Sequence, residues 1–220
     1  MRKLLFLLVA FIIFAADMQA QAWVFVPDYG DTGWRTYVYQ TGPAGFTGTA
    51  GFVVSNVIDD SAYSELLLDN LSHGGGLSNR DFEEGDYSGY ILWGDGCAEV
   101  TGSVMAYSGT IYDAAQGEYF SHQLGLGTGV STAAFQNARR QAGTTGSILE
   151  TSISLPPESR FTFNWAFLAG DQSPWNDFAL FYLKDANGKV VFSAGLAQIG
   201  AAPAPASVSP AVLLLLEAGF

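Results

Sequence analysis

The chain has 220 residues, 21 of them acidic and 9 basic, with a formal net charge of −12 and a single cysteine. A field of this sign repels nucleic acid and anionic lipid surfaces, so nucleic-acid binding is not expected. One cysteine excludes an internal disulfide, and the fold must therefore be held by its core and by any metal ion that it binds.

The N-terminus has the pattern of a secretory signal peptide. Arg2 and Lys3 precede an unbroken apolar run over residues 4–16, and a small-x-small triplet follows at residues 20–22. This order is typical of a cleaved leader, and the run is shorter than the roughly 20 residues that cross a bilayer. We therefore expect residues 1–22 to be removed, no stable membrane span in the mature chain, and a secreted or cell-surface protein that begins near Trp23.

Residues 23–200 show strand periodicity without an amphipathic helical pattern. Short runs of β-branched, aromatic and aliphatic residues alternate with Gly, Asn, Asp and Pro. This spacing predicts a single all-β domain, a jelly-roll β-sandwich. The expected strands are residues 34–40, 46–55, 65–71, 89–93, 98–106, 118–124, 147–155, 160–168, 177–183 and 190–194.

Two of these runs predict which side chains are buried. Large aromatic residues occupy every second position from Phe161 to Phe167, so one face of this strand should face the core. The run 178–183 is apolar at both parities, which indicates a central strand covered on both faces. Asn187 and Gly188 next to it predict a hairpin turn.

Several segments resemble a known family. Residues 161–182, FTFNWAFLAGDQSPWNDFALFY, are similar to a signature of secreted bacterial proteins with a PEP-CTERM type tail. The segment 201–220, AAPAPASVSPAVLLLLEAGF, resembles a Pro/Ala linker followed by the start of such a tail, although Glu217 interrupts it and the basic terminus of the family is missing. The resemblance implies sorting to the cell surface or to an extracellular matrix.

A second resemblance concerns the order of the strands. Residues 79–90, NRDFEEGDYSGY, look like the opening strand of galactose-binding-type jelly rolls, and 65–71, ELLLDNL, resemble the closing strand. The closing strand comes first here, so our hypothesis is a circular permutation, with residues 23–72 supplying closing strands and 79–200 opening and central strands. The alternative, a tandem array cut to parts of two units, would leave unpaired sheet edges. The family often holds a structural calcium where these strands meet, which by resemblance implicates Asp69 and Glu83.

A second candidate for calcium follows from the residues themselves. The segment 171–177 places Asp171, Asn176 and Asp177 close together in a loop, and calcium takes oxygen ligands of this kind. The alternative is that Asp and Asn only form the loop by bonding their own backbone. Calcium, as a structural ion, is the only cofactor that we expect.

Aromatic residues in or near loops are candidates for binding a sugar, because Trp and Tyr combine an apolar ring with a polar edge. The candidate ligand-binding residues are Tyr87, Trp93 and Trp175. The alternative for each is packing in the core or in a loop. The expected partner is an extracellular polysaccharide or a surface protein.

Residues for catalysis are not recognisable. His73 and His122 belong to no triad, and Cys97 has no second cysteine and no histidine near it in the sequence, so we expect neither a zinc site nor a catalytic thiol. We therefore expect a non-enzymatic binding or scaffold module. The alternative is a glycan-directed hydrolase or lyase that uses two loop carboxylates. Such a pair would be drawn from Glu83, Glu84, Asp86, Asp113, Glu118 and Asp171.

Overall fold

The computed structural model describes residues 22–59, 62–72, 79–125 and 130–202. Nearly all of the predicted signal peptide (residues 1–21) and of the sorting-like tail (residues 203–220) lies outside this part of the chain. The described strands are β1 (Val24–Val26), β2 (Arg35–Gln40), β3 (Phe46–Ser55), β4 (Glu65–Ser72), β5 (Ile91–Trp93), β6 (Asp95–Val100), β7 (Val104–Met105), β8 (Ile111–Tyr112), β9 (Tyr119–Leu124), β10 (Gly146–Leu155), β11 (Arg160–Leu168), β12 (Phe178–Lys184) and β13 (Val190–Ile199).

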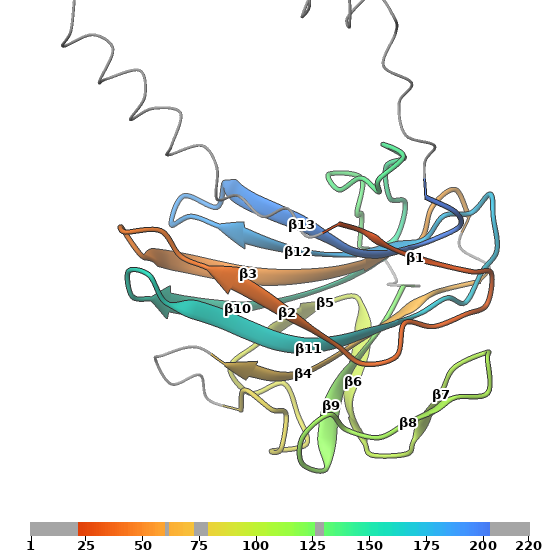
Figure 1. The fold of residues 1–220 in the computed structure, drawn as a ribbon, viewed down its shortest axis with the longest axis horizontal. Helices are drawn as coiled ribbons and strands as arrows, with labels where there is room; N and C mark the ends of the chain where they lie inside the picture. Colours follow the sequence, from red (N-terminus) through yellow and green to blue (C-terminus); the bar gives the residue numbers. More distant parts are fainter. Residues whose placement is uncertain (1–21, 60–61, 73–78, 126–129, 203–220) are drawn as a thin grey trace, which may run out of the picture.

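These strands form two main sheets and a small hairpin (Figure 1). One sheet has the order β1-β13-β12-β3-β10-β5, and the other has the order β2-β11-β4-β9-β6. The strand β1 runs parallel to β13, whereas the other described pairs are antiparallel. Strands β7 and β8 pair only with each other.

The two main sheets pack face to face around an aromatic core. The ring of Phe163 on β11 lies 4.9 Å from that of Phe52 on β3 and 5.1 Å from that of Phe181 on β12, measured between centroids. These three side chains are fully buried in one cluster with residues from both sheets. The predicted β-sandwich is therefore confirmed.

The predicted burial patterns are also confirmed. In β11 the alternating aromatics from Phe161 to Phe167 all belong to the central core. In β12 every residue from Phe178 to Leu183 is buried, because the odd and even positions face two different apolar clusters. Residues 185–188 form the predicted turn, with the Gly188 amide donating to the Asp185 carbonyl at 2.9 Å.

The predicted strand 98–106 is wrong in its bounds, since two shorter strands take its place. Strand β6 ends at Val100, and β7 begins at Val104. Between them Gly102 has a φ of +74°, and the Ser103 amide donates to the Val100 carbonyl at 3.0 Å. Glycine adopts this left-handed conformation at little cost. The chain therefore turns at Gly102, although the expected strand runs through this position.

Residues 79–90, expected as an opening strand, form turns instead. Asn79 and Phe82 have positive φ values of 48° and 61°, which are incompatible with a regular strand. Phe82 is nevertheless fully buried, and the Leu71 amide at the end of β4 donates to the Arg80 carbonyl at 2.9 Å. The two segments are thus neighbours, but they do not pair as strands, and the permutation stays a hypothesis.

Each main sheet also carries a smaller apolar cluster on its outer face. On the five-stranded sheet the β7–β8 hairpin brings Val104 and Tyr112 against Phe120 and Leu67. On the six-stranded sheet Phe135, from the segment before β10, stacks on Tyr182 at 5.2 Å between centroids. The segments that form these two clusters do not cover the region around β5. There Ile91 and Trp93 are 59% and 42% exposed.

Candidate functional site

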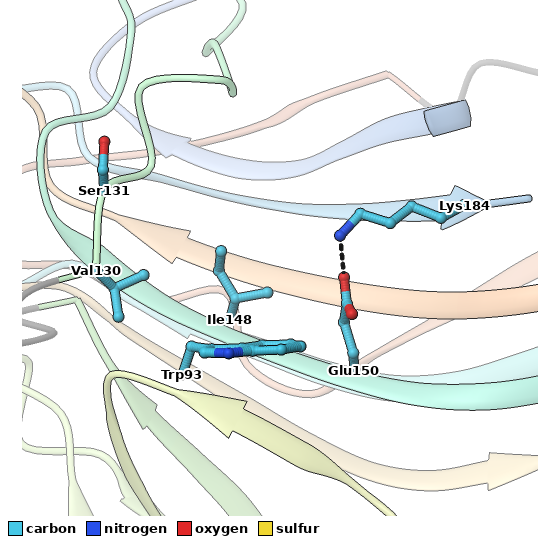
Figure 2. Close-up of a pocket in the computed structure, with 6 residues that line it drawn as sticks. All are labelled: Trp93, Val130, Ser131, Ile148, Glu150 and Lys184. Carbon is cyan, nitrogen blue, oxygen red and sulfur yellow. Dashed lines mark hydrogen bonds and ion pairs between the residues drawn. The ribbon is translucent and has the colours of Figure 1, made fainter. Parts of the chain in front are cut away.

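A groove of about 350 Å³ lies on the open part of the outer face of the six-stranded sheet. Its described lining consists of Trp93, Val130, Ser131, Ile148, Glu150 and Lys184. Figure 2 shows the indole of Trp93 beside Ile148, with the Glu150–Lys184 contact at one end and Ser131 at the other. The groove therefore combines an exposed aromatic ring with a fixed pair of charges.

The strand register creates this arrangement. Trp93 on β5 lies opposite Ile148 on β10, and Glu150 lies opposite Gly51 on β3. These positions alternate with core-facing residues, so their side chains share the outer face. The pairing of β3 with β12 then brings Lys184 to the same side, diagonally across from Glu150.

Gly51 makes room for the polar end of the groove. A Cβ atom there would lie 2.1 Å from Cζ of Tyr182, so the phenol ring occupies the space that a side chain would need. The Tyr182 hydroxyl donates to Oε1 of Glu150, and the Lys184 ammonium donates to the same oxygen. Burial and the bond to Glu150 raise the pKa of Tyr182, so the phenol stays protonated at neutral pH.

The groove offers two kinds of contact to a ligand. The flat face of the indole can pack against apolar atoms, and the charged groups beside it can hydrogen-bond polar ones. Glu150 is only 8% exposed and already bonded, so its position is fixed before a ligand arrives. The sequence singled out Trp93, whereas Glu150 and Lys184 were missed because only the register brings them together.

The two residues implicated in calcium binding by resemblance do meet at one loop. Asp69, fully buried in β4, accepts the amides of Asn70 at 2.6 Å and Gln116 at 2.8 Å. Glu83 accepts the amides of Glu118 at 2.7 Å and Tyr119 at 2.9 Å. Burial raises the pKa of Asp69 to about 6 against the effect of these bonds, and the charge of Glu83 adds to the rise. Backbone N–H groups thus already engage both carboxylates.

The second calcium candidate lies at the other end of the sandwich, between β11 and β12. Asp171, Asn176 and Asp177 are all buried there. Oδ1 of Asp177 accepts the Val57 amide at 3.0 Å, and Oδ2 accepts the Ser64 hydroxyl at 3.0 Å. Burial raises the pKa of Asp177 to about 7, with the nearby carboxylate of Asp171 contributing.

Two oxygens of this second cluster are buried without a hydrogen-bond partner in the described part of the chain. They are Oδ2 of Asp171 and Oδ1 of Asn176. A buried acceptor that lacks a donor is costly unless a cation or water satisfies it. The donor chemistry of this cluster therefore fits a hard cation better than that of Asp69 and Glu83.

The other two aromatic candidates are placed differently from Trp93. The hydroxyl of Tyr87 donates to the Cys97 carbonyl at 2.8 Å, and its ring packs edge-on against Phe82. Tyr87 thus helps to hold strands β6 and β9 in place. Trp175 is half-buried in the loop before β12, where its amide donates to the Gln172 carbonyl at 3.0 Å. The groove includes neither of them.

Cys97 does have a histidine beside it, contrary to the expectation from sequence. It lies directly opposite His122 in the antiparallel pair β6–β9, and both side chains lie on the outer face of the five-stranded sheet. Partial desolvation of the thiol, together with the bond to and the charge of Glu99, raises the pKa of Cys97 to about 12. A thiol with such a pKa is a poor nucleophile at neutral pH.

The carboxylates considered for catalysis fall into two separate groups. Glu83, Glu84 and Asp86 belong to the turns after β4, next to the loop that holds Asp113 and Glu118. Asp171 follows the end of β11 that pairs with Glu65, at the opposite end of the sheet. Among the described residues that line the groove, Glu150 is the one carboxylate.

Within the described ranges, no helix has the length and apolar character required to cross a bilayer.

Comparison with known proteins adds little to this picture. No family model matches the sequence, and no curated protein matches it. One similar solved structure is the CBM3a-L domain with flanking linkers from scaffoldin cipA of the cellulosome of Clostridium thermocellum. It is 14% identical, and the match covers 75% of this chain and 96% of that chain with a TM-score of 0.15. At this TM-score the likeness carries no argument about fold or function.

Proposed function

We propose that this protein is an exported, non-catalytic binding module that attaches to an extracellular polysaccharide through the groove at Trp93. The observation that carries the proposal is the 42% exposed indole beside the preformed Glu150–Lys184 pair. A ligand that covers this ring removes apolar surface from water, which favours binding. The polar groups next to the ring favour a sugar over a purely apolar ligand.

The chemistry of the groove supports binding rather than hydrolysis. Glycoside hydrolysis requires two carboxyl groups about 5 to 10 Å apart across the bond that is cut. The described lining of the groove supplies Glu150 alone, and its Oε1 is engaged by Tyr182 and Lys184. A carboxylate held in this way is suited to accept hydrogen bonds from sugar hydroxyls. The leader-like N-terminus supports a location outside the cell.

Calcium, in this proposal, is a structural ion and not part of the binding groove. The buried acceptors of Asp171 and Asn176 support its placement in the loop between β11 and β12. There it would satisfy oxygens that otherwise lack donors and would join this loop to the segment around Val57 through Asp177.

A glycan array followed by calorimetric titration of the strongest hit tests the proposal. Trp93→Ala should weaken binding at least tenfold, because stacking on the indole is lost. Tyr107→Ala is the matched control, since Tyr107 is also exposed, at 65%, but lies in the turn between β7 and β8. An array without signal, or equal affinity of the wild type and Trp93→Ala, would refute the proposal.

A reducing-end assay with the same glycan tests the non-catalytic part. The glycan should keep its length after prolonged incubation with the wild-type protein. Release of shorter fragments would favour the alternative, a glycan hydrolase or lyase that uses loop carboxylates such as Glu83 and Glu118.

A further inference from the structure

Three different metal-ligating side chains meet on the outer face of strands β6 and β9. They are Cys97 and Glu99, two positions apart on β6, and His122, directly opposite Cys97 on β9. One donor atom from each residue lies within 4.8 Å of the donor atoms of the other two. We propose that these three residues bind a zinc ion, at a site that is separate from the groove and lies on the opposite sheet.

The imidazole is already oriented for such an ion. Nε2 of His122 lies 2.8 Å from Oε2 of Glu65 on the neighbouring strand β4. A carboxylate only accepts hydrogen bonds, so Nε2 carries a proton and Nδ1 is the nitrogen that would bind the ion, in its unprotonated form. Nδ1 faces Glu99, 3.7 Å from Oε1. A histidine whose second nitrogen is held by a carboxylate is the usual arrangement at zinc sites.

The spacing of the donor atoms is close to that of a tetrahedral site. Sγ of Cys97 lies 3.0 Å from Oε1 of Glu99, and Nδ1 of His122 lies 3.7 Å from the same oxygen. Bonds of about 2.0 to 2.3 Å from zinc place neighbouring ligands roughly 3.3 to 3.8 Å apart. Small movements of exposed or half-buried side chains on the edge strand β6 and its neighbour β9 therefore suffice to close the site.

The charges balance when zinc binds. The thiol releases its proton to solvent as the Zn–S bond forms, and the thiolate and the Glu99 carboxylate together offset the two charges of the ion. Three protein ligands leave a fourth position for water, because Cys97 is exposed. The mixed sulfur, nitrogen and oxygen set favours zinc over calcium or magnesium, which prefer oxygen alone.

Equilibrium dialysis of the full chain against zinc, with the thiol kept reduced by a phosphine, tests the proposal. The wild type should bind one zinc ion at this site, and Cys97→Ser or His122→Asn should weaken binding at least tenfold. Glu84→Gln is the control for a nonspecific acidic surface, because Glu84 is exposed and lies outside the cluster. Absence of zinc binding, or binding that neither Cys97→Ser nor His122→Asn affects, would overturn the proposal.

Cobalt substitution gives an answer that does not depend on the folding of a variant. The wild-type protein loaded with Co²⁺ should show a near-ultraviolet thiolate-to-metal charge-transfer band, which Zn²⁺ should abolish in competition. A cobalt complex without this band would exclude Cys97 as a ligand and overturn the site as described.

Glu65 has a positioning role in this proposal, and its test differs from that of the ligands. Glu65→Gln should weaken zinc binding by about 10- to 100-fold, as is typical for a residue that orients a ligating histidine. The stoichiometry and the charge-transfer band should stay the same, since the three ligands remain. Unchanged zinc affinity would contradict the role assigned to Glu65.

Discussion

Gly51 is the residue on which the polar end of the groove most depends. A methyl group at this position would meet the Tyr182 ring at 2.1 Å, and the ring is held between Glu150 and Phe135. Gly51→Ala should therefore destabilise the fold by about 1 to 3 kcal/mol, the usual cost of overpacking, when measured by urea unfolding. Gly42→Ala is the control, because a Cβ atom there meets no atom within 4 Å. Equal stability of the two variants would contradict this account of Gly51.

The raised pKa of Asp177 predicts that the stability of the folded protein depends on pH. Its pKa in the folded protein is about 7, whereas an unfolded aspartate titrates near 3.9. Between about pH 4 and pH 7 the folded state holds a proton that the unfolded state has released, so this residue's contribution to stability falls as pH rises.

Urea unfolding in chelator at several pH values measures this effect. Asp177→Asn should lose less stability between pH 4.5 and pH 7.5 than the wild type, because its side chain does not titrate. The amide oxygen can still accept the Val57 amide, so the variant remains folded. The same decline in both proteins would show that Asp177 titrates normally.

At the residue scale, the sequence indicated which single residues could bind a ligand. It did not indicate which other residues lie beside them in the fold. Trp93 could be chosen because an aromatic residue next to a glycine-rich turn stands out in the sequence. The pairing of Glu150 with Lys184, and of Cys97 with His122, depends on which strands are adjacent and in which register. A single sequence does not determine that register, and a histidine that is distant along the chain was therefore missed.

Most strands were predictable at the scale of elements because their apolar patterns are long. The strands from β9 to β12 agree with the expected ranges to within one residue at each end. Strands β1 and β8 were missed because they have only three and two residues, too few to show a period. The turns over residues 79–90 were missed because the buried side chain of Phe82 suggests a strand. Its backbone instead has the left-handed conformation of a turn.

The β7–β8 hairpin depends on one carboxylate outside it. Asp31 accepts the Tyr112 hydroxyl at 2.8 Å and the Thr110 hydroxyl at 3.2 Å, and it also accepts the Ser108 hydroxyl. Although desolvation opposes the effect, these bonds lower the pKa of Asp31, so it is ionised when it holds the hairpin.

Asp31→Ala should raise amide hydrogen exchange in residues 104–112 and lower the free energy of unfolding by about 1 to 3 kcal/mol. Asp113→Ala is the control, because within the described residues its carboxylate accepts one weak bond, from Thr101 at 3.3 Å. Exchange in the hairpin that is the same in Asp31→Ala and the wild type would show that apolar packing alone holds it.

At the scale of the whole molecule, the three proposed binding sites lie on different parts of the sandwich. The groove lies on the six-stranded sheet, the proposed zinc site on the five-stranded sheet, and the proposed calcium site in the loop between β11 and β12. The net charge of −12 favours the binding of cations at the two proposed metal sites. Because the sites are separate, each one can be removed by substitution without loss of the others.

Calcium should stabilise the protein through the loop at Asp171. Raising calcium to about 100 times its Kd in metal-free protein should raise the Tm by about 5 to 10 °C, since only the folded state holds the ion. Asp171→Asn should reduce this rise, and Glu83→Gln should leave it intact. A melting curve that is unchanged across the calcium titration would remove calcium from the account.

The most direct test of polysaccharide binding follows the indole N–H signals of the five tryptophans by NMR during titration with an oligosaccharide from the array. Substitution of each tryptophan by phenylalanine assigns its signal. We predict that the Trp93 signal shifts in a saturable manner while that of the buried Trp165 stays in place. A shift of Trp175 without Trp93, or no shift at all with bound sugar, would contradict the assignment of the binding face.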